Sequence, residues 1–449
     1  MLEHRLTTSA PLARGSLWPA ILALAWPMML SAVLAGVLQN GQVWVLGRDG
    51  SDSRALYLLS MLQPYFLLFI AFMEGLAVTN QVFSARSARQ WPRRRVWHST
   101  LWLILAGAAA TAILAPAASL LARHAPTMAG ADMREVWRAL PWYLGSLLPL
   151  LCFEIVNAGL RGQGRTLPGL ALSLSAACLN LACCYALFAY GGLGFEAIVA
   201  ANALSYGVFC LPLAWILRRA VRDGEAGPAA AFRARLLAIL LDAGLPVFLT
   251  IVVAFASSAV VFPALAGLSG DNSVAFLLVI KLRMLFVIPA VALGSAVAIL
   301  ANQRLEGDPE GRGGLLREGL LLVACVYLAL TALAWWQQHA LIDLLSRSAG
   351  VRAAGYQLMQ WLLPTFFLTA LSTMLQTLLE QLGRGKQVLL ATLALELGLA
   401  AAILLAIAQA RALDWVLGCM LVCALLYAAV FLREFFRLAR TPSEARHDA

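Results

Sequence analysis

Long, unbroken apolar runs are the feature that most restricts how this chain can fold. The 449-residue sequence contains twelve of them, each about twenty residues or longer. Such a run crosses a hydrocarbon core of roughly 30 Å as an α-helix, whereas membrane β-strands alternate apolar and polar residues. The runs are 17–45, 55–84, 96–121, 136–160, 167–190, 193–217, 237–268, 273–303, 315–338, 353–381, 387–409 and 412–436. The sequence therefore predicts an all-α polytopic membrane protein with twelve transmembrane helices.

The composition supports this class and excludes others. Hydrophobic residues make up 61% of the chain and charged residues 12%, about half the charged share of a soluble domain. The net charge of +10 could suggest nucleic acid, but no basic stretch is interleaved with aromatic residues, so no nucleic-acid partner is expected. The eight cysteines lie in apolar runs without histidine or aspartate at metal spacing, so we expect no metal site and no disulfide framework.

The distribution of basic residues predicts the orientation of the chain. Even-numbered loops and both termini carry 23 arginines and lysines, whereas odd-numbered loops carry 8. The positive-inside rule then places both termini in the cytoplasm. We expect a multi-pass protein of the bacterial inner membrane, a monomer whose partners are the lipid bilayer and a small-molecule substrate.

The two halves of the chain repeat the same motifs. Pro27 is matched by Pro246 and Gly75 by Gly294, in both cases 219 residues later. Further matches at nearby offsets are Gln81 with Gln303, Pro141 with Pro364, and Gly162-Gln163-Gly164-Arg165 with Gly383-Arg384-Gly385-Lys386. Six helices per half give both halves the same orientation, which predicts two six-helix lobes related by a pseudo-twofold axis along the membrane normal. The N-lobe is 1–217, a cytoplasmic linker is 218–236, and the C-lobe is 237–449.

The repeated motifs resemble those of the multidrug and toxic compound extrusion (MATE) family, in the MOP flippase superfamily. The motifs are Leu24-Ala25-Trp26-Pro27, Gly75-Leu76-Ala77-Val78-Thr79-Asn80-Gln81, Leu160-Arg161-Gly162-Gln163-Gly164-Arg165-Thr166, Asn180, Gly194-Phe195-Glu196, Gly244-Leu245-Pro246, Arg283 with Pro289 and Gly294, and Gln303. The resemblance implies a secondary active exporter, an antiporter that rocks two lobes to move a small amphipathic compound or drug out of the cytoplasm against H⁺ or Na⁺. It implies no cofactor beyond that coupling ion.

Two other functions are alternatives to this one. The first is a flippase or exporter of a lipid-linked or natural-product precursor without conventional cation coupling, which would need a wider, cationic cleft with more basic residues than Lys281 and Arg283. The second is a membrane enzyme, but the sequence offers no nucleophile–base pair, metal cluster or phosphate-binding loop. We therefore expect no catalytic residues.

Several acids that the resemblance leads us to expect are missing. Gln42 stands where helix one of the family usually has an aspartate, Cys184 where helix five often has one, and Ala254 where helix seven of some members has a glutamate. Amides remain in the implied N-lobe pocket. They are Gln42, Asn157, Asn180 and Asn202.

Charged residues within the apolar runs are the candidates for coupling, because a charge at mid-bilayer costs about 2.5–3.5 kcal/mol and needs a partner or a role. They are Glu74, Glu154, Lys281, Arg283, Glu380 and Glu396. Glu154 is the first candidate, because it lies three residues before Asn157 on one helix face. The alternatives for Glu154 are a structural ion pair with Lys281 or Arg283 and a position at the lipid edge. Glu74 would take part in coupling, contact the cargo or lie satisfied in the core.

The expected substrate cavity draws on residues of several runs. Glu380 would line it, or would pair with Arg384 four residues later. If Lys281 faces the cavity, the expected cargo carries a carboxylate or phosphate. Tyr65 and Phe255 would line an apolar part of it, although packing between helices is the commoner use of aromatic residues.

Overall fold

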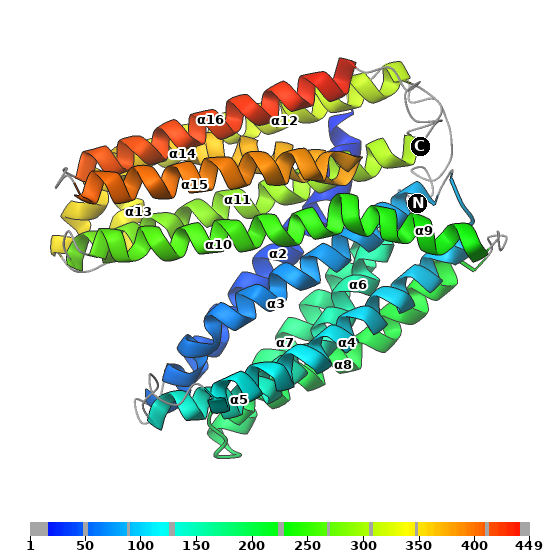
Figure 1. Cartoon of the computed structure of the whole chain (residues 1–449), viewed down its shortest axis with the longest axis horizontal. Helices are drawn as coiled ribbons and strands as arrows, with labels where there is room; N and C mark the ends of the chain where they lie inside the picture. Colours follow the sequence, from blue (N-terminus) through cyan, green and yellow to red (C-terminus); the bar gives the residue numbers. More distant parts are fainter. Residues whose placement is uncertain are drawn as a thin grey trace. The chain divides into compact units, whose positions relative to one another are not determined.

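The computed structural model describes residues 17–47, 53–87, 90–124, 131–222, 229–266, 270–304, 309–345, 349–408 and 413–440. Throughout these ranges the chain is helical and forms no β-strand (Figure 1). The first helices are α2 (Trp18–Gly47), α3 (Ser53–Arg86), α4 (Arg94–His124), α5 (Ala131–Ser146), α6 (Leu148–Gly162), α7 (Leu167–Ala189), α8 (Phe195–Ala220), α9 (Ala229–Ile239) and the π-helical η1 (Leu240–Gly244). They are followed by α10 (Leu245–Ala266), α11 (Gly270–Arg304), α12 (Pro309–Trp336), α13 (Gln338–Leu345), α14 (Ala349–Leu379), the π-helical η2 (Glu380–Arg384), α15 (Gly385–Ala408) and α16 (Leu413–Arg440).

The predicted number of membrane spans is confirmed. Ten segments of the described ranges are long and apolar enough to cross a bilayer. One of them, Ala349–Ala406, has 58 residues, which is enough for two crossings, and a kink at Gly383 divides it into α14 and α15. The 30-residue helix α2 adds one more, with a shorter apolar stretch at Trp18–Leu34. The total is twelve, as the apolar runs indicated.

The chain divides into two compact units. The N-terminal unit is Leu30–Gly244, and the C-terminal unit is Met1–Met29 together with Leu245–Ala449. Both divisions fall within two residues of a matched proline, Pro27 in the first case and Pro246 in the second. Proline has no backbone N–H to donate, so each division lies where a long helix is weakest. The boundaries of the predicted lobes, 1–217 and 237–449, come from repeated motifs, whereas the two compact units come from contacts. The lobe boundaries therefore stay a prediction.

The expected linker is partly helical. Its second half, which the sequence analysis placed outside the spans, belongs to α9, and α9 continues through η1 into α10. The fourth predicted run also differs, because α5 and α6 are separate helices that meet at Leu147. Pro149 lies at the start of α6, where its missing N–H costs no helical hydrogen bond.

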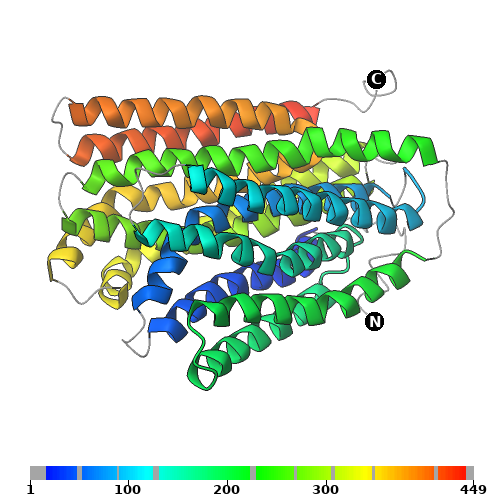
Figure 2. The same cartoon turned by 60° about the horizontal axis from the view of Figure 1, so that its bottom comes forward.

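The core of the N-terminal unit lies among α3, α4, α6 and α8. Phe83 and Phe153 are among its fully buried side chains. Asn80 on α3 ties three of these helices together, because its Nδ2 atom donates to Thr100 Oγ1 of α4 at 2.9 Å and to the Ile155 carbonyl of α6 at 2.7 Å. Helices α7 and α8 run side by side (Figures 1 and 2), which brings their polar side chains together.

The core of the C-terminal unit lies along α14, which packs against α11 and α16 (Figure 1). Phe276 of α11 and Phe366 of α14 are buried there. Gly294 allows the close approach of α11 to α14, because a Cβ atom on this residue would lie 2.7 Å from the Met374 carbonyl oxygen. The matched Gly75 and Gly294 of the sequence repeat therefore lie on helices that pack closely within their own units.

Two glycines with left-handed backbone conformation show which residues of the two halves correspond after the helices α6 and α14. Gly164 has φ +78° and Gly383 has φ +86°, a conformation that favours glycine. They are 219 residues apart, the offset that also relates Pro27 to Pro246. The motif match had paired Gly162 with Gly383, so the backbone shifts this part of the repeat by two residues.

Candidate functional site

A cluster of buried amides joins α2, α7 and α8 in the N-terminal unit. Gln42 Nε2 donates to Asn180 Oδ1 at 2.8 Å and to Asn202 Oδ1 at 2.9 Å. Asn180 Nδ2 donates to Asn202 Oδ1 and to Ser205 Oγ, both at 3.0 Å. The structure thus brings together three residues that the sequence singled out. Ser205 was missed, although it lies three residues after Asn202 on one face of α8, which could have identified it. We call these four residues the amide cluster.

The amide cluster is neutral and closed on itself. Asn202 Oδ1 accepts two of its hydrogen bonds and Asn180 Oδ1 accepts one, while Ser205 Oγ donates to the Ala201 carbonyl at 2.7 Å. Cys184 of α7 is buried as a free thiol. Hard cations are held by several free oxygen ligands, and here the side-chain oxygens of Asn180 and Asn202 already accept hydrogen bonds from N–H donors. The arrangement suits a link between three helices better than a cation site.

Removing the central amide should destabilise the protein. Gln42→Ala removes the observed donor to Asn180 Oδ1 and one of the two donors to Asn202 Oδ1, so we expect a loss of about 1.5 kcal/mol. Gln387→Ala is the matched control, because Gln387 is exposed on α15 and its removal should change stability by less than about 0.5 kcal/mol. Thermal unfolding of the detergent-purified variants gives the comparison, and equal midpoints would contradict the structural role of the cluster.

Asn157 does not join the amide cluster. It lies on α6, and its Oδ1 atom sits against Gly169 at the start of α7, so closely that a Cβ on Gly169 would lie 2.0 Å away. Asn180 is eleven residues further along α7, about 16 Å at the α-helical rise. The sequence placed both amides in one pocket because it shows which helices carry them, but not at which depth the helices cross.

Three charged side chains form a second group in the N-terminal unit. Arg161 Nη2 lies 3.5 Å from Glu154 Oε2, two turns away on α6. Glu74 of α3 lies within Coulomb range of both. The expected partners of Glu154 were Lys281 or Arg283, but its partner in the structure is Arg161, seven residues later on the same helical face. One carboxylate is therefore paired with the Arg161 guanidinium and a second lies in its field, and we call these three residues the charged group.

The C-terminal unit holds a buried acid with polar neighbours. Glu380, at the start of η2, is 4% exposed. Gln376 Nε2 donates to its Oε1 at 3.2 Å, and Thr250 of α10 is its second hydrogen-bonding neighbour. The expected pair with Arg384 does not form between these two described side chains. The left-handed backbone of Gly383 lies between them and turns Arg384 off the face that an unbroken α-helix would share.

A further acid of the C-terminal unit has a tyrosine and a cation as neighbours. Tyr427 of α16 donates its hydroxyl to Glu396 Oε1 of α15 at 2.9 Å. Arg283 of α11 is half-buried and lies within Coulomb range of Glu396. This grouping explains both intramembrane charges at once, because each provides the opposite charge that the other needs.

The remaining candidates do not gather around one cavity. Tyr65 packs edge-on against Trp137 with ring centroids 5.6 Å apart, as a helix-packing residue does. Phe255 is 39% exposed on α10. The side chain of Lys281 lies outside the described residues. None of these three is placed by the structure as a lining residue of a shared pocket in the part of the chain it describes.

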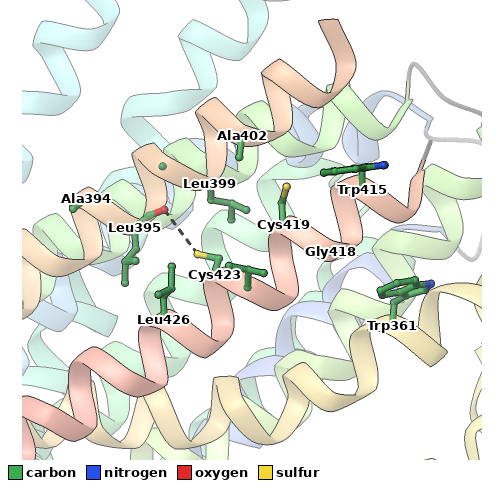
Figure 3. A pocket seen from close by; sticks show the side chains of 12 residues that line it. Trp361, Ala394, Leu395, Leu399, Ala402, Trp415, Gly418, Cys419, Cys423 and Leu426 are labelled. Carbon is green, nitrogen blue, oxygen red and sulfur yellow. Dashed lines mark hydrogen bonds between the residues drawn. The ribbon is translucent and has the colours of Figure 1, made fainter. Parts of the chain in front are cut away.

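An apolar groove of about 740 Å³ lies between α15 and α16 (Figure 3). Trp361 of α14 and Trp415 of α16 lie along it, and Gly398 and Gly418 leave room for it. Cys423 Sγ donates to the Leu395 carbonyl at 3.8 Å within the groove. It contains none of the candidate residues.

Comparison with known proteins identifies the fold. Residues 246–404 match the MatE family model, and no curated protein matches the chain. A transporter of the MOP superfamily from Pyrococcus furiosus Vc1 has 19% sequence identity and a TM-score of 0.80, with 95% of this chain and 96% of that chain covered; a reverse polarity of its binding pocket suggests a different function for it. An outward-facing multidrug resistance MATE family transporter of the same superfamily has 19% identity and a TM-score of 0.80, with 96% and 98% covered.

A third solved structure gives the same result at lower identity. A mutant of the Vibrio cholerae MATE transporter VcmN has 15% identity and a TM-score of 0.81, with 94% of this chain and 97% of that chain covered. At these identities the likenesses show the fold. Together with the matched family segment, they confirm the resemblance that the sequence motifs indicated.

Proposed function

We propose that the chain is a membrane transporter of the MATE family in the MOP superfamily, and that it exports a small amphipathic organic compound in exchange for a cation. The observation that carries this proposal is the extent of the match, which covers the full set of spans rather than one motif. Acidic side chains buried within those spans supply groups that an exchange of charge requires.

The proton is the proposed coupling ion. A hard metal cation would need several free oxygen ligands, and the Asn180 and Asn202 oxygens of the amide cluster already accept hydrogen bonds. A proton needs only one base, and the described spans contain several buried or half-buried carboxyl groups, among them the four acids that the sequence singles out within the apolar runs. They are Glu74, Glu154, Glu380 and Glu396.

Flux measurements test the proposal directly. Purified protein in proteoliposomes should move the cationic dye ethidium faster under an imposed pH gradient, acidic on the side that the dye enters, and should be indifferent to a Na⁺ gradient. Acceleration by Na⁺ alone would contradict proton coupling. Flux indifferent to both gradients would favour the flippase, which would then be tested with a fluorescent phospholipid in the same vesicles.

Glu154 has a structural role in this proposal. Its ion pair with Arg161 and the nearby Glu74 make it part of a charged group that holds α3 against α6. We expect Glu154→Gln to retain acceleration by a pH gradient. A loss of that acceleration in folded Glu154→Gln protein would return Glu154 to the position of first coupling candidate.

The distribution of basic residues supports a proposed orientation in the membrane. Basic residues concentrate in even-numbered loops, so both termini would lie in the cytoplasm of a bacterial inner-membrane protein. Separately from the charge distribution, we propose a monomer. The positions of cysteine labels added to exposed loops would test this orientation in intact cells.

A further inference from the structure

We propose that Glu380 in the C-terminal unit binds the transported proton. This inference rests on the proton-coupled export proposed above and adds the residue and the hydrogen-bond change that carry it. Glu380 lies at the junction of α14 and η2, beside the left-handed Gly383, where the helix is already interrupted. It was expected to line the cavity or to pair with Arg384, and the structure gives it different surroundings.

Neutral groups surround the Glu380 carboxyl. Gln376 donates to it from the same helix, and Thr250 approaches it from α10. An ionised carboxylate that is 4% exposed and lacks a cation costs free energy, so such a group is held most readily with its proton on. Glu380 can therefore take up a proton when water reaches it and retain the proton when the site closes.

Charged groups on the neighbouring elements do not supply a counter-ion in the described structure. Helix α10 contains no titratable residue, and η2 also packs against α11, α14 and α15. At the end of α11 that follows Asn302, the charged residue is Arg304, whose side chain is outside the described residues. The charged residue of α14 is Arg352, near the end of that helix far from Glu380. Arg384 ends η2 and Lys386 begins α15, but the interactions observed for the Glu380 carboxyl are those with Gln376 and Thr250.

The other three intramembrane acids differ in this respect. Glu154 is ion-paired with Arg161, and Glu74 lies within Coulomb range of the same guanidinium. Glu396 accepts from a tyrosine and lies within Coulomb range of Arg283. Among these acids of the described chain, Glu380 is the one whose observed partners are all neutral.

At the position of Glu380, the first half of the repeat carries a residue of the opposite charge. With Gly164 matched to Gly383 at 219 residues, Arg161 in the first half corresponds to Glu380 in the second. Asn157, four residues before Arg161, corresponds to Gln376, which is four residues before Glu380 and donates to it. In the first half this position holds the cation of the charged group. In the second half it holds an acid whose observed partners are neutral.

Thr250 provides a hydrogen-bond switch. Its hydroxyl donates to the Pro246 carbonyl at 2.8 Å, which uses its single hydrogen. In that state the hydroxyl oxygen can accept a hydrogen bond from protonated Glu380. When Glu380 loses its proton, the carboxylate can only accept, so Thr250 turns to donate to it and releases Pro246. Proton binding is thereby linked to α10 next to Leu245, where the C-terminal unit begins.

Transport by two pairs of variants tests the proposal. Ethidium export driven by a pH gradient should fall at least tenfold in Glu380→Gln and should persist in Glu380→Asp, which keeps a titratable group. Thr250→Val removes the switch and should flatten the pH profile of export, whereas Thr250→Ser should keep it. Glu396→Gln is the matched buried control and should retain acceleration by the gradient. Full gradient-driven export by Glu380→Gln would overturn the proposal.

The result also separates this inference from the proposed function. If the unaltered protein does not respond to a pH gradient, proton-coupled export itself fails. If it responds and Glu380→Gln responds equally, export stands and only the assignment to Glu380 fails.

A measurement on the unaltered protein guards against a variant that does not fold. Dicyclohexylcarbodiimide, an apolar carbodiimide, reacts with protonated carboxyl groups inside membranes, and peptide mass spectrometry locates the adduct. We expect modification at Glu380 that declines as the pH is raised, with little at Glu154. Modification confined to Glu154 or Glu396 would overturn the proposal.

Discussion

Gly162→Ala is expected to destabilise the N-terminal unit by about 3 kcal/mol, because the added methyl group has no space. A Cβ on Gly162 would lie 2.4 Å from the Gln81 carbonyl oxygen, 2.6 Å from Ser84 Cβ and 2.9 Å from the Ala85 nitrogen. Two of these three atoms belong to the backbone of α3, so no side-chain rotation can relieve the overlap. The helices α3 and α6 would have to separate.

The separation would break further contacts at the same crossing. Ser84 Oγ donates to the Gly159 carbonyl at 2.6 Å, and Gln163 Nε2 donates to Ser84 Oγ at 2.9 Å. Gly207→Ala is the matched control, since a Cβ there meets nothing within 4 Å and alanine is the better residue inside a helix. Thermal unfolding in detergent should show a large loss for Gly162→Ala and none for Gly207→Ala. Equal behaviour of the two variants would contradict the close crossing.

The fold was largely predictable because the bilayer sets the length of each span. Runs such as 193–217 correspond closely to α8, and the total of twelve follows from run length alone. Local backbone changes within runs were not predictable in the same way. The break at Leu147 and the left-handed Gly383 interrupt segments whose hydropathy is continuous, so hydropathy gives no signal for them.

The candidate site was predictable in its residue types but not in its pairings. Gln42, Asn180 and Asn202 were grouped from their positions in a family resemblance, and the structure joins them by hydrogen bonds. Partners of charged residues were wrong because helix spacing gives only the neighbours on one helix. The i,i+4 rule paired Glu380 with a residue beyond a kink, and it gave no indication of Thr250 on another helix.

Hydrogen-bond partners within the second half also needed the three-dimensional structure. Gln381 Nε2 donates to Ser295 Oγ at 2.9 Å, and Asn302 Nδ2 donates to the Gln381 carbonyl at 3.1 Å. These bonds hold η2 against α11, across a sequence separation that no local pattern covers. They explain how an interrupted helix can keep a fixed geometry around Glu380.

Arg161→Gln is expected to cost about 3 kcal/mol, because it removes the cation that Glu154 and Glu74 share. Breaking a buried ion pair from one side leaves an uncompensated charge, and the cost here is set at the lower end of the usual range because the Arg161 and Glu154 side chains are 19% and 21% exposed. Thermal unfolding of the detergent-purified variant measures the loss. Transport is not the readout, because the prediction concerns the packing of α3 and α6.

A second substitution should recover part of that loss. Arg161→Gln combined with Glu154→Gln removes both charges of the pair, so the double variant should be more stable than Arg161→Gln alone. Arg437→Gln is the matched control, because Arg437 lies 2.8 Å from Glu434 but is 57% exposed, and its loss should cost less than about 0.5 kcal/mol. An Arg161→Gln cost no larger than that of the control, or a double variant no more stable than the single one, would show that the charged group does not hold these helices together.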